Sequence, residues 1–444
     1  MLSTIEPEAV VAETPRRRSR FQMGVTLNLI GAVFNQGSTF VFSIIAANLL
    51  GRETFGKYGI VASTLVMLSQ VSQLACGYTV TKYVAEFRSS DREKTGRLIG
   101  MLVTIVALVA LLASVGLFVG ASWLSTSILK APELSLGLRI GSGVVFLNVL
   151  IGLFMGALAG LEAYRGLSHG LIVYGTIYLI VCSLMTWKFG LNGAFWGLLV
   201  SAILGCVLLL KVLVSECRSQ DIHIQIAAFP QLRPILLNFA MPAAISGLTY
   251  LPAIWIGNGI LVRQPGGYSQ MALFSAAFAL MTAVLFIPNN TYVVSWSILN
   301  HHKGLGESGD YRSIFKLNLV VVGLAAVAGA LMLALAGPGL LLLFGRDFRG
   351  GYPVLLVLLG AALPQVLALA ILQHLQSQER MWFSFFAVIL PRDLLLVGLA
   401  YVFIPRSGAF GLAGACGLAW TVSLLAAAGI TSRAGLQTAQ VATP

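Results

Sequence analysis

Apolar runs of about twenty residues or more recur along the whole chain, and the first extends from Val25 to Leu50. A helix that crosses a bilayer needs about 20 consecutive apolar residues. Only 10% of the 444 residues are charged and 57% are hydrophobic, against roughly 25% charged residues in a soluble domain. Because the runs do not alternate with polar residues, they predict helices and not the strands of a barrel. The sequence therefore predicts an all-α integral membrane protein.

Charged and turn-forming residues divide the apolar runs into about twelve predicted transmembrane helices. They are expected near residues 24–50, 59–84, 99–123, 138–163, 169–187, 192–214, 234–262, 271–298, 317–343, 352–376, 383–404 and 409–431. The longest polar connection, residues 215–233, is predicted to be a cytoplasmic linker between a bundle at 23–214 and a bundle at 234–431. Residues 1–22 and 432–444 are predicted to be cytoplasmic tails, the first of them disordered because it is polar and has no periodicity.

The net charge of +12 reflects membrane topology and gives no reason to expect a nucleic-acid partner. If the amino terminus is cytoplasmic, eighteen Lys and Arg residues fall in inside segments and nine fall in outside segments. Cytoplasmic loops carry such an excess of basic residues, and a miscounted helix would remove it. We therefore expect both termini to be cytoplasmic.

The two predicted bundles show signs of an internal repeat. Lys130 stands 35 positions before Arg165, and Gly345 stands 35 positions before Arg380, at the corresponding places in the two halves. Six helices per half is an even number, so the halves have the same orientation and form parallel repeats about an axis along the membrane normal. This arrangement predicts a transporter whose central cavity opens alternately to either side.

One pair of ionisable residues, Arg392 and Asp393, lies about nine residues inside a predicted span. Charges at this depth are costly, so each is a candidate functional residue. Neighbours at positions i and i+1 point about 100° apart, so we expect at least one of the two to seek a partner on another helix or in a hydrated cavity. Two interpretations stay open: an anion-binding Arg392, or an ion pair that holds this helix to its bundle.

Polar amides form stripes on the first two predicted helices. Asn28 and Asn35 follow one face of the first helix, and Gln70 and Gln73 follow the second helix, which ends at Lys82. Such stripes face either another helix, through interhelical hydrogen bonds, or a hydrated path for sugars, whose hydroxyls need amide partners.

Further amides occur near helix-breaking residues in the second half. Asn258 follows Pro252 in the seventh predicted helix, and Pro288 precedes Asn289 and Asn290 in the eighth, where it predicts a bend that is either a hinge or a binding site. The five cysteines have no metal-binding spacing, His301 and His302 have no third ligand nearby, and no phosphate-binding loop occurs. We therefore expect no metal and no cofactor.

Two segments of the first half resemble a known family. The runs LLGRETFGKYG at 49–59 and GYTVTKYVAE at 77–86 look like bacterial polysaccharide flippases of the multidrug/oligosaccharidyl-lipid/polysaccharide superfamily, which has a MATE-like fold. The second half agrees less sharply, through ALFSAA at 272–277 and through Leu343 to Gly345 with Tyr352. The resemblance covers nearly the whole chain.

The resemblance implies that the protein is not an enzyme but a flippase of the bacterial inner membrane, serving surface (O-antigen type) polysaccharide synthesis. Its substrate would be a polyprenyl-diphosphate-linked oligosaccharide, and its partners membrane lipids, a polysaccharide polymerase and glycosyltransferases. A diphosphate needs cations, and Lys82 occupies the basic position of the motif in the second helix. The resulting set of candidate substrate-binding residues is Lys82, Arg392, Asp393, Asn28, Asn35, Gln70, Gln73, Asn258, Asn289 and Asn290.

One departure from the family concerns ion coupling. Relatives often carry an acidic residue in the seventh helix, whereas the segment from Trp255 to Asn258 contains none. Coupling to a Na⁺ or H⁺ gradient through that position is therefore not expected, and Asp393 is the alternative candidate. A multidrug exporter of the same superfamily would need an anionic cavity, and a membrane polysaccharide polymerase or ligase would need a large outer loop with catalytic groups. Both remain as alternative functions.

Overall fold

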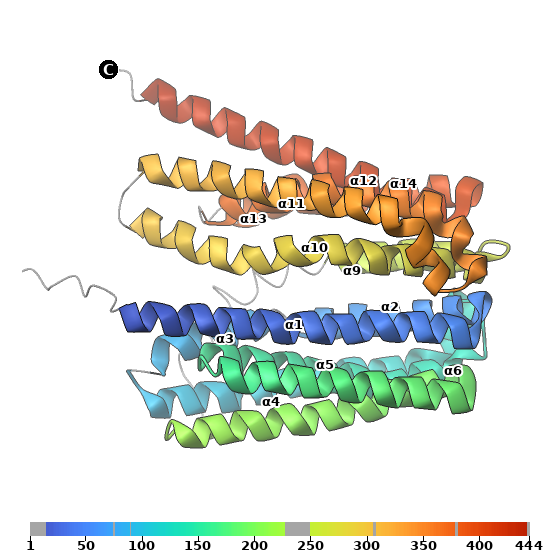
Figure 1. Ribbon diagram of the computed structural model, residues 1–444, viewed down its shortest axis with the longest axis horizontal. Helices are drawn as coiled ribbons and strands as arrows, with labels where there is room; N and C mark the ends of the chain where they lie inside the picture. The colour runs from blue at the N-terminus through green and yellow to red at the C-terminus, as the bar shows by residue number, and fades with distance from the viewer. Residues whose placement is uncertain are drawn as a thin grey trace, which may run out of the picture.

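In the computed structural model the chain is helical throughout the described residues, which are 15–73, 76–88, 90–226, 249–304, 308–377 and 381–441. The helices run side by side along the long axis of the molecule (Figure 1). The helical elements are α1 (Pro15–Leu50), α2 (Arg52–Gln73), α3 (Cys76–Phe87), α4 (Arg92–Trp123), the π-helix η1 (Leu124–Ile128), α5 (Leu134–Gly160), α6 (Tyr164–Ser219), α9 (Tyr250–Val262), α10 (Gly267–Gly304), α11 (Ser308–Leu343), the 3₁₀-helix η3 (Arg346–Gly351), α12 (Tyr352–Ser377), α13 (Met381–Ser384), the π-helix η4 (Phe385–Ile389) and α14 (Leu390–Val441).

Eight of the described helices are long and apolar enough to cross a membrane, or nine if the bent pair α2 and α3 forms one span. Two of these eight fold back on themselves. Helix α6 has 56 residues and α14 has 52, and each contains one glycine with non-helical backbone angles, Gly190 or Gly408. In α6 the two arms pack antiparallel, since the ring of Tyr174 occupies the space that a Cβ on Gly205 would need. Counted by arms, the described residues hold eleven spans, and α9 is the described end of the predicted seventh.

Three sharp turns recur at corresponding places in the two halves. Gly51 and Gly266 have positive φ angles and stand 215 positions apart, and Lys130 and Gly345 have positive φ angles at the same separation. Gly190 and Gly408 follow 218 positions apart with nearly the same backbone angles. Positive φ favours glycine, and five of these six turn residues are glycines. The turns recur at nearly constant separation, as expected for the repeat predicted from Lys130 and Gly345.

The first half, α1 to α6, lies on one side of the molecule, and the second half, α9 to α14, lies on the other (Figure 1). Helix α1 begins and α14 ends at the same end of the molecule, which we call the terminal end. Within the first half α1 packs along α6, and α5 packs against α4 and α6; within the second half α14 packs against α12 and α9.

The predicted tails differ from the structure. Helix α1 begins at Pro15, inside the stretch predicted to be disordered, because proline is favoured at the first position of a helix, where its missing N–H is not needed. Helix α14 continues to Val441, through most of the predicted tail at 432–444. Helix α6 continues to Ser219, so the linker begins later than predicted. Residues 227–248 lie outside the description.

Candidate functional site between the two halves

The two halves meet at the end of the molecule opposite the termini, which we call the outer end. Gly56 of α2 packs directly on the backbone of Tyr268 of α10, because a Cβ on Gly56 would lie 1.8 Å from the Tyr268 carbonyl oxygen. Near it, the Asn48 amide donates a hydrogen bond to the Leu343 carbonyl at 2.6 Å, and Arg52 Nε donates to the Ser269 carbonyl at 3.2 Å. These contacts close the outer end.

Aromatic rings add to this contact. Phe55 of α2 lies edge-on against Phe344 and Phe348, with ring centroids 6.3 and 5.8 Å away, and Phe40 of α1 lies 6.0 Å from Phe344. Phe55, Phe344 and Phe348 are buried. Edge-to-face pairs stabilise by roughly 0.5–1.5 kcal/mol beyond the area that they bury, so the outer end is held by packing as well as by hydrogen bonds.

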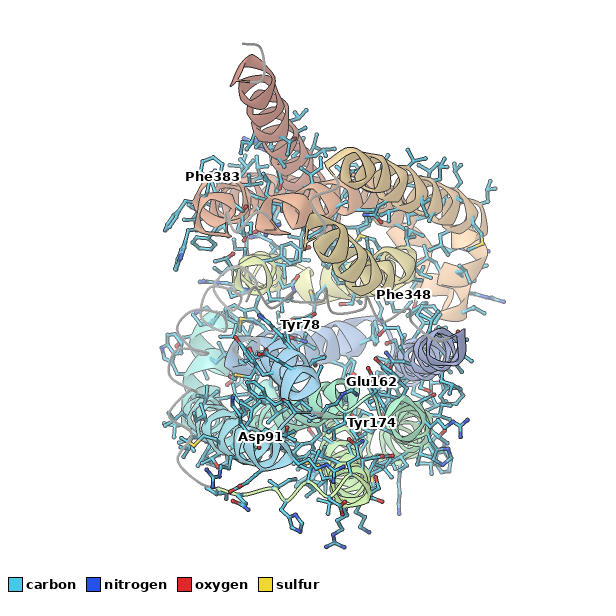
Figure 2. All side chains as sticks on the ribbon, turned by 90° about the vertical axis from the view of Figure 1, so that its left-hand side faces the viewer. Tyr78, Asp91, Glu162, Tyr174, Phe348 and Phe383 are labelled. Atoms are coloured by element: carbon cyan, nitrogen blue, oxygen red, sulfur yellow. The ribbon has the colours of Figure 1, made fainter. Side chains whose placement is uncertain are left out.

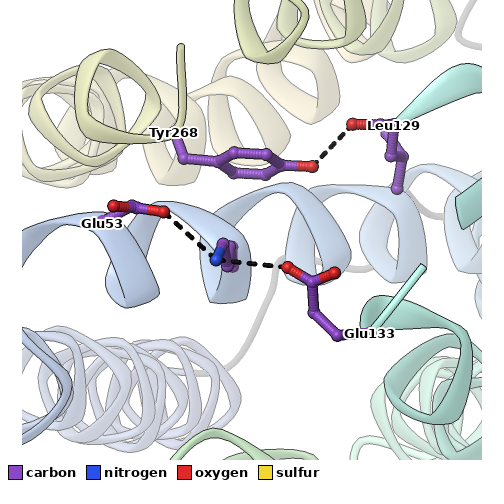
Figure 3. A network of polar contacts seen from close by, with 5 residues as sticks. Glu53, Leu129, Glu133 and Tyr268 are labelled. Atoms are coloured by element: carbon purple, nitrogen blue, oxygen red, sulfur yellow. Dashed lines mark hydrogen bonds and ion pairs between the residues drawn. The ribbon is translucent and has the colours of Figure 1, made fainter. Parts of the chain in front are cut away.

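A polar network lies beside these rings (Figure 3). Lys57 forms ion pairs of 3.2 Å with Glu53 and with Glu133, both in the first half. Tyr268 of the second half places its ring 5.6 Å from Lys57 Nζ and donates a hydrogen bond of 2.7 Å from its hydroxyl to the Leu129 carbonyl. Tyr268 thus docks on a cation and a carbonyl that the first half already holds in place.

Glu133 remains ionised at neutral pH in this network. Its pKa is lowered because its own backbone amide donates a hydrogen bond to the carboxylate; partial burial opposes this effect, and Lys57 reinforces it. Glu133 is therefore available as an anionic partner for Lys57 at neutral pH.

We expect Gly56→Val to prevent closure of the outer end, because the added carbons have to displace the backbone at Tyr268. Transport should be lost while the two halves stay folded, which surface polysaccharide per cell and the thermal unfolding of the purified protein measure. Gly116→Val is the matched control, since a Cβ at Gly116 meets nothing within 4 Å. Unchanged transport in Gly56→Val would contradict the contact seen here.

The deepest polar contact between the halves joins α9 to α2. Trp255 Nε1 donates a hydrogen bond of 2.8 Å to Thr64 Oγ1. Along α2, the stripe that meets the second half at Gly56 and Gly59 continues at Gln70, which is fourteen and eleven residues further on. Among the described residues, polar contacts between the halves extend from the outer end to the level of Thr64, and Gln70, further toward the terminal end, is exposed.

Helix α3 continues this exposed surface. Cys76, Thr79, Val80 and Val84 are buried against the rest of the first half, whereas Tyr78 is 70% exposed and Lys82, one turn later on the same face, is also exposed. Figure 2 shows Tyr78 on the side of the first half that faces the second half. We call the surface formed by Gln70, Tyr78 and Lys82 the interlobe face. It exposes an amide, an aromatic ring and a cation.

Other predicted amides do not lie on this face. The Gln73 amide packs against α5, where Gly152 has no side chain and a Cβ would lie 1.8 Å from Gln73 Nε2. Asn35 packs against α6, where Gly175 approaches its Cα, and Asn28 is half-buried seven residues earlier on α1. For Gln73 the structure favours the interhelical interpretation, because Gly152 leaves room for its amide against α5.

In the second half, Asn258 is buried one turn from Trp255, and its side-chain oxygen has no hydrogen-bond partner among the described residues. Asn289 and Asn290 lie within α10, but their side chains fall outside the description.

Arg392 and Asp393 pair with each other, and Arg392 also has the expected partners elsewhere, in the rings of Tyr250 and Trp420. Arg392 donates to both carboxylate oxygens of Asp393, from Nε at 2.7 Å and from a terminal nitrogen at 3.0 Å. The angle of 100° between neighbouring side chains does not prevent the pair, because the long arginine side chain bends back to the short aspartate. The π-helix η4 ends at Ile389, two residues before Pro391, which has no N–H to donate.

The ion pair is enclosed within the second half. Arg392 is 4% exposed and Asp393 is 3% exposed. The guanidinium lies 4.2 Å from the ring centre of Trp420 and 5.2 Å from that of Tyr250. Aromatic rings attract a desolvated cation by about 2 kcal/mol, so these rings and Asp393 together satisfy the charge. This environment favours the interpretation of a structural ion pair.

Several residues of the site could not be identified from the sequence. The Trp255–Thr64 contact and the network around Lys57 join segments far apart in the chain. The glycines at 56 and 59, three residues apart on one helix, were the available signal of a close approach.

Residues 22–256, slightly more than half of the chain, match the family described as polysaccharide biosynthesis protein. The EPS I polysaccharide export inner membrane protein EpsE of Ralstonia nicotianae is 22% identical over 398 residues, which cover 87% of this chain and 88% of that protein.

The fold is that of solved transporters. An inward-facing multidrug resistance MATE family transporter of the MOP superfamily aligns with a TM-score of 0.81 at 14% identity and covers 95% of this chain and 100% of that one. A MOP superfamily transporter from Pyrococcus furiosus, described as having a binding pocket of reversed polarity, aligns with a TM-score of 0.69 at 15% identity, over 91% of this chain and 93% of that one. At these identities the likeness establishes the fold, and the predicted MATE-like architecture is confirmed.

Proposed function

The chain belongs to the polysaccharide biosynthesis protein family and is a membrane transporter with the MOP superfamily fold, not an enzyme, and from this premise we propose that it flips a polyprenyl-diphosphate-linked oligosaccharide. The lipid-linked sugar would pass from the cytoplasmic to the periplasmic leaflet of the bacterial inner membrane by alternating access. The observation that carries this proposal is the interlobe face: Lys82 and Gln70 are exposed on the terminal side of the contacts that join the halves.

The chemistry of this face suits a diphosphate sugar. Lys82 supplies a cation for the diphosphate, Gln70 offers amide donors and an acceptor for hydroxyls, and Tyr78 offers a ring on which a sugar can stack. The polyprenyl tail would stay in the bilayer, since only the headgroup has to leave the aqueous phase. In this conformation the closed outer end would shield the headgroup from the periplasm, and we propose that this is the state that loads substrate from the cytoplasm.

The drug exporter finds less support in the described residues. A cationic drug needs an unpaired carboxylate inside the membrane, and the buried carboxylate of Asp393 is already paired with Arg392. The same pairing argues against Asp393 as a site for ion coupling.

A strain that lacks this chain tests the proposed function. We expect loss of surface polysaccharide together with accumulation of the lipid-linked oligosaccharide in the inner leaflet, measured by the accessibility of its sugars to an impermeant lectin in vesicles of each orientation. Restoring the chain should reverse both effects. Normal polysaccharide with increased sensitivity to cationic drugs would instead identify a drug exporter.

The topology follows from the proposed direction of transport and has its own test. Ser90 lies at the terminal end, in the turn before α4, and Ser407 lies at the outer end, in the turn of α14. A cysteine at Ser90 should react with an impermeant reagent only in permeabilised cells, and one at Ser407 should react in intact cells. The five native cysteines are buried, so the background should be low. The opposite labelling pattern would reverse the topology.

A further inference from the structure

An apolar groove of about 310 Å³ runs along the folded helix α6. Six residues of its first arm, between Ile172 and Val181, line it together with Leu204 of the second arm. All are aliphatic except Thr176, whose hydroxyl donates a hydrogen bond to the Ile172 carbonyl. The groove therefore offers hydrocarbon contacts and leaves no polar group in need of a partner.

The groove lies on the part of the first half that is remote from the second half. Helix α6 packs against α1 and α5, whereas the polar contacts between the halves come from α1, α2, α9, α10 and the turns at Leu129 and Asp347. In Figure 1 α6 forms the side of the molecule farthest from α14. A molecule in this groove is thus in the bilayer and not in the space between the halves.

Basic residues continue both walls of the groove toward the terminal end. On the first arm, His169 stands seven residues and Arg165 eleven residues before Thr176, which places them on the same helix face. On the second arm, Lys211 and Arg218 follow Leu204 by seven and fourteen residues and lie on one face with it.

The two basic stripes lie at the same depth. Leu209 fills the space beside Gly170, and Val212 fills the space beside Gly166, so His169 and Lys211 face each other across the two arms. All four basic side chains are exposed. No ion pair joins any of them to a carboxylate within the described part of the chain; Glu216, the nearest acidic residue along α6, is turned toward Gly166.

We propose that this groove binds an anionic phospholipid of the cytoplasmic leaflet. One acyl chain occupies the groove, and the phosphate lies among Arg165, Lys211 and Arg218, with His169 as a further donor. Seven helical residues span about 10 Å, so Lys211 lies at a suitable height above Leu204 to meet a headgroup whose chain reaches the groove. Basic sites between transmembrane helices on the cytoplasmic side bind anionic headgroups. The position remote from the second half favours a bulk phospholipid over the polyprenyl tail of the substrate.

Native mass spectrometry of the purified full-length protein tests this site, with phosphatidylglycerol and phosphatidylcholine of identical acyl chains as probes. The first phosphatidylglycerol should bind at least ten-fold more tightly than phosphatidylcholine. Lys211→Ala with Arg218→Ala should weaken phosphatidylglycerol binding about twenty-five-fold, because each basic residue near an anionic lipid contributes about a five-fold change. Binding of phosphatidylcholine should not change.

Two further variants distinguish binding in the groove from nonspecific electrostatic attraction of the anionic lipid. Ile177→Trp fills the groove and leaves every cation in place, so it should also weaken phosphatidylglycerol binding. Lys188→Ala with Arg406→Ala removes two exposed cations at the outer end and should have no effect.

Equal binding of both phospholipids, an equal loss in the outer-end control, or displacement of phosphatidylglycerol by undecaprenyl phosphate at equal concentration would each overturn the proposal. If the Lys211 and Arg218 double variant does not fold, Ile177→Trp and the single variant Lys211→Ala decide the question. The deletion-strain experiment tests the proposed function without reference to this groove. A negative result in the lipid-binding experiment would therefore leave the proposed function unaffected.

Discussion

Lys82→Gln is expected to reduce transport of the lipid-linked oligosaccharide by ten-fold to a hundred-fold. A hydrogen bond to a charged group contributes about 1.5–3 kcal/mol, and each 1.4 kcal/mol corresponds to a factor of ten. Lys82 is exposed on the interlobe face, so its loss should leave folding unchanged. Surface polysaccharide per cell, normalised to the amount of protein in the membrane, measures the effect.

Two matched variants make this result specific. Lys82→Arg keeps the positive charge and should retain most of the transport. Lys94→Gln removes a charge from α4, where the ammonium lies 3.9 Å from the ring centre of Phe87, and should transport normally. Transport by Lys82→Gln at the normal rate would show that the interlobe face does not bind the diphosphate through this residue.

Arg392→Gln is expected to destabilise the protein by roughly 3–5 kcal/mol, because removing one partner of a buried ion pair leaves the other charge uncompensated. Asp393 would then face the rings of Tyr250 and Trp420, which suit a cation and not a carboxylate. Thermal unfolding of the detergent-purified protein and its abundance in membranes measure the loss.

The double variant Arg392→Gln with Asp393→Asn distinguishes the two roles of this pair. It removes both charges, so it should recover much of the stability that the single variant loses. Substrate binding by Arg392 predicts a different outcome: normal abundance of Arg392→Gln without surface polysaccharide, and no recovery of transport in the double variant.

The membrane class, the helical fold and the division into two halves could be predicted because they depend on local hydrophobicity. Apolar runs specify a span without reference to any partner. Lys130 and Gly345, which predict a repeat, both have positive φ angles in sharp turns. Helix α1 begins at Pro15, inside the stretch predicted to be disordered, because a helix continues beyond an apolar run where no residue ends it.

The candidate site could be predicted only in part. Lys82 and Gln70 are exposed, and their contact with a substrate stays a prediction. Gln73, three residues from Gln70 on the same helix, instead meets Gly152 of α5. Both glutamines fit the same sequence pattern, and the difference between them depends on a glycine about eighty positions away.

By itself, the sequence determined that this chain crosses a membrane many times in two related halves, since burial of apolar side chains in lipid is decided residue by residue. The tertiary structure alone decided which polar side chains are available to a substrate. Gly56 allows the halves to meet at the outer end, and Thr64 accepts a hydrogen bond from Trp255 of the other half. Asp393 forms a buried ion pair with Arg392. These outcomes depend on how each helix is rotated against its neighbours, and that rotation is fixed by packing between segments distant in the chain.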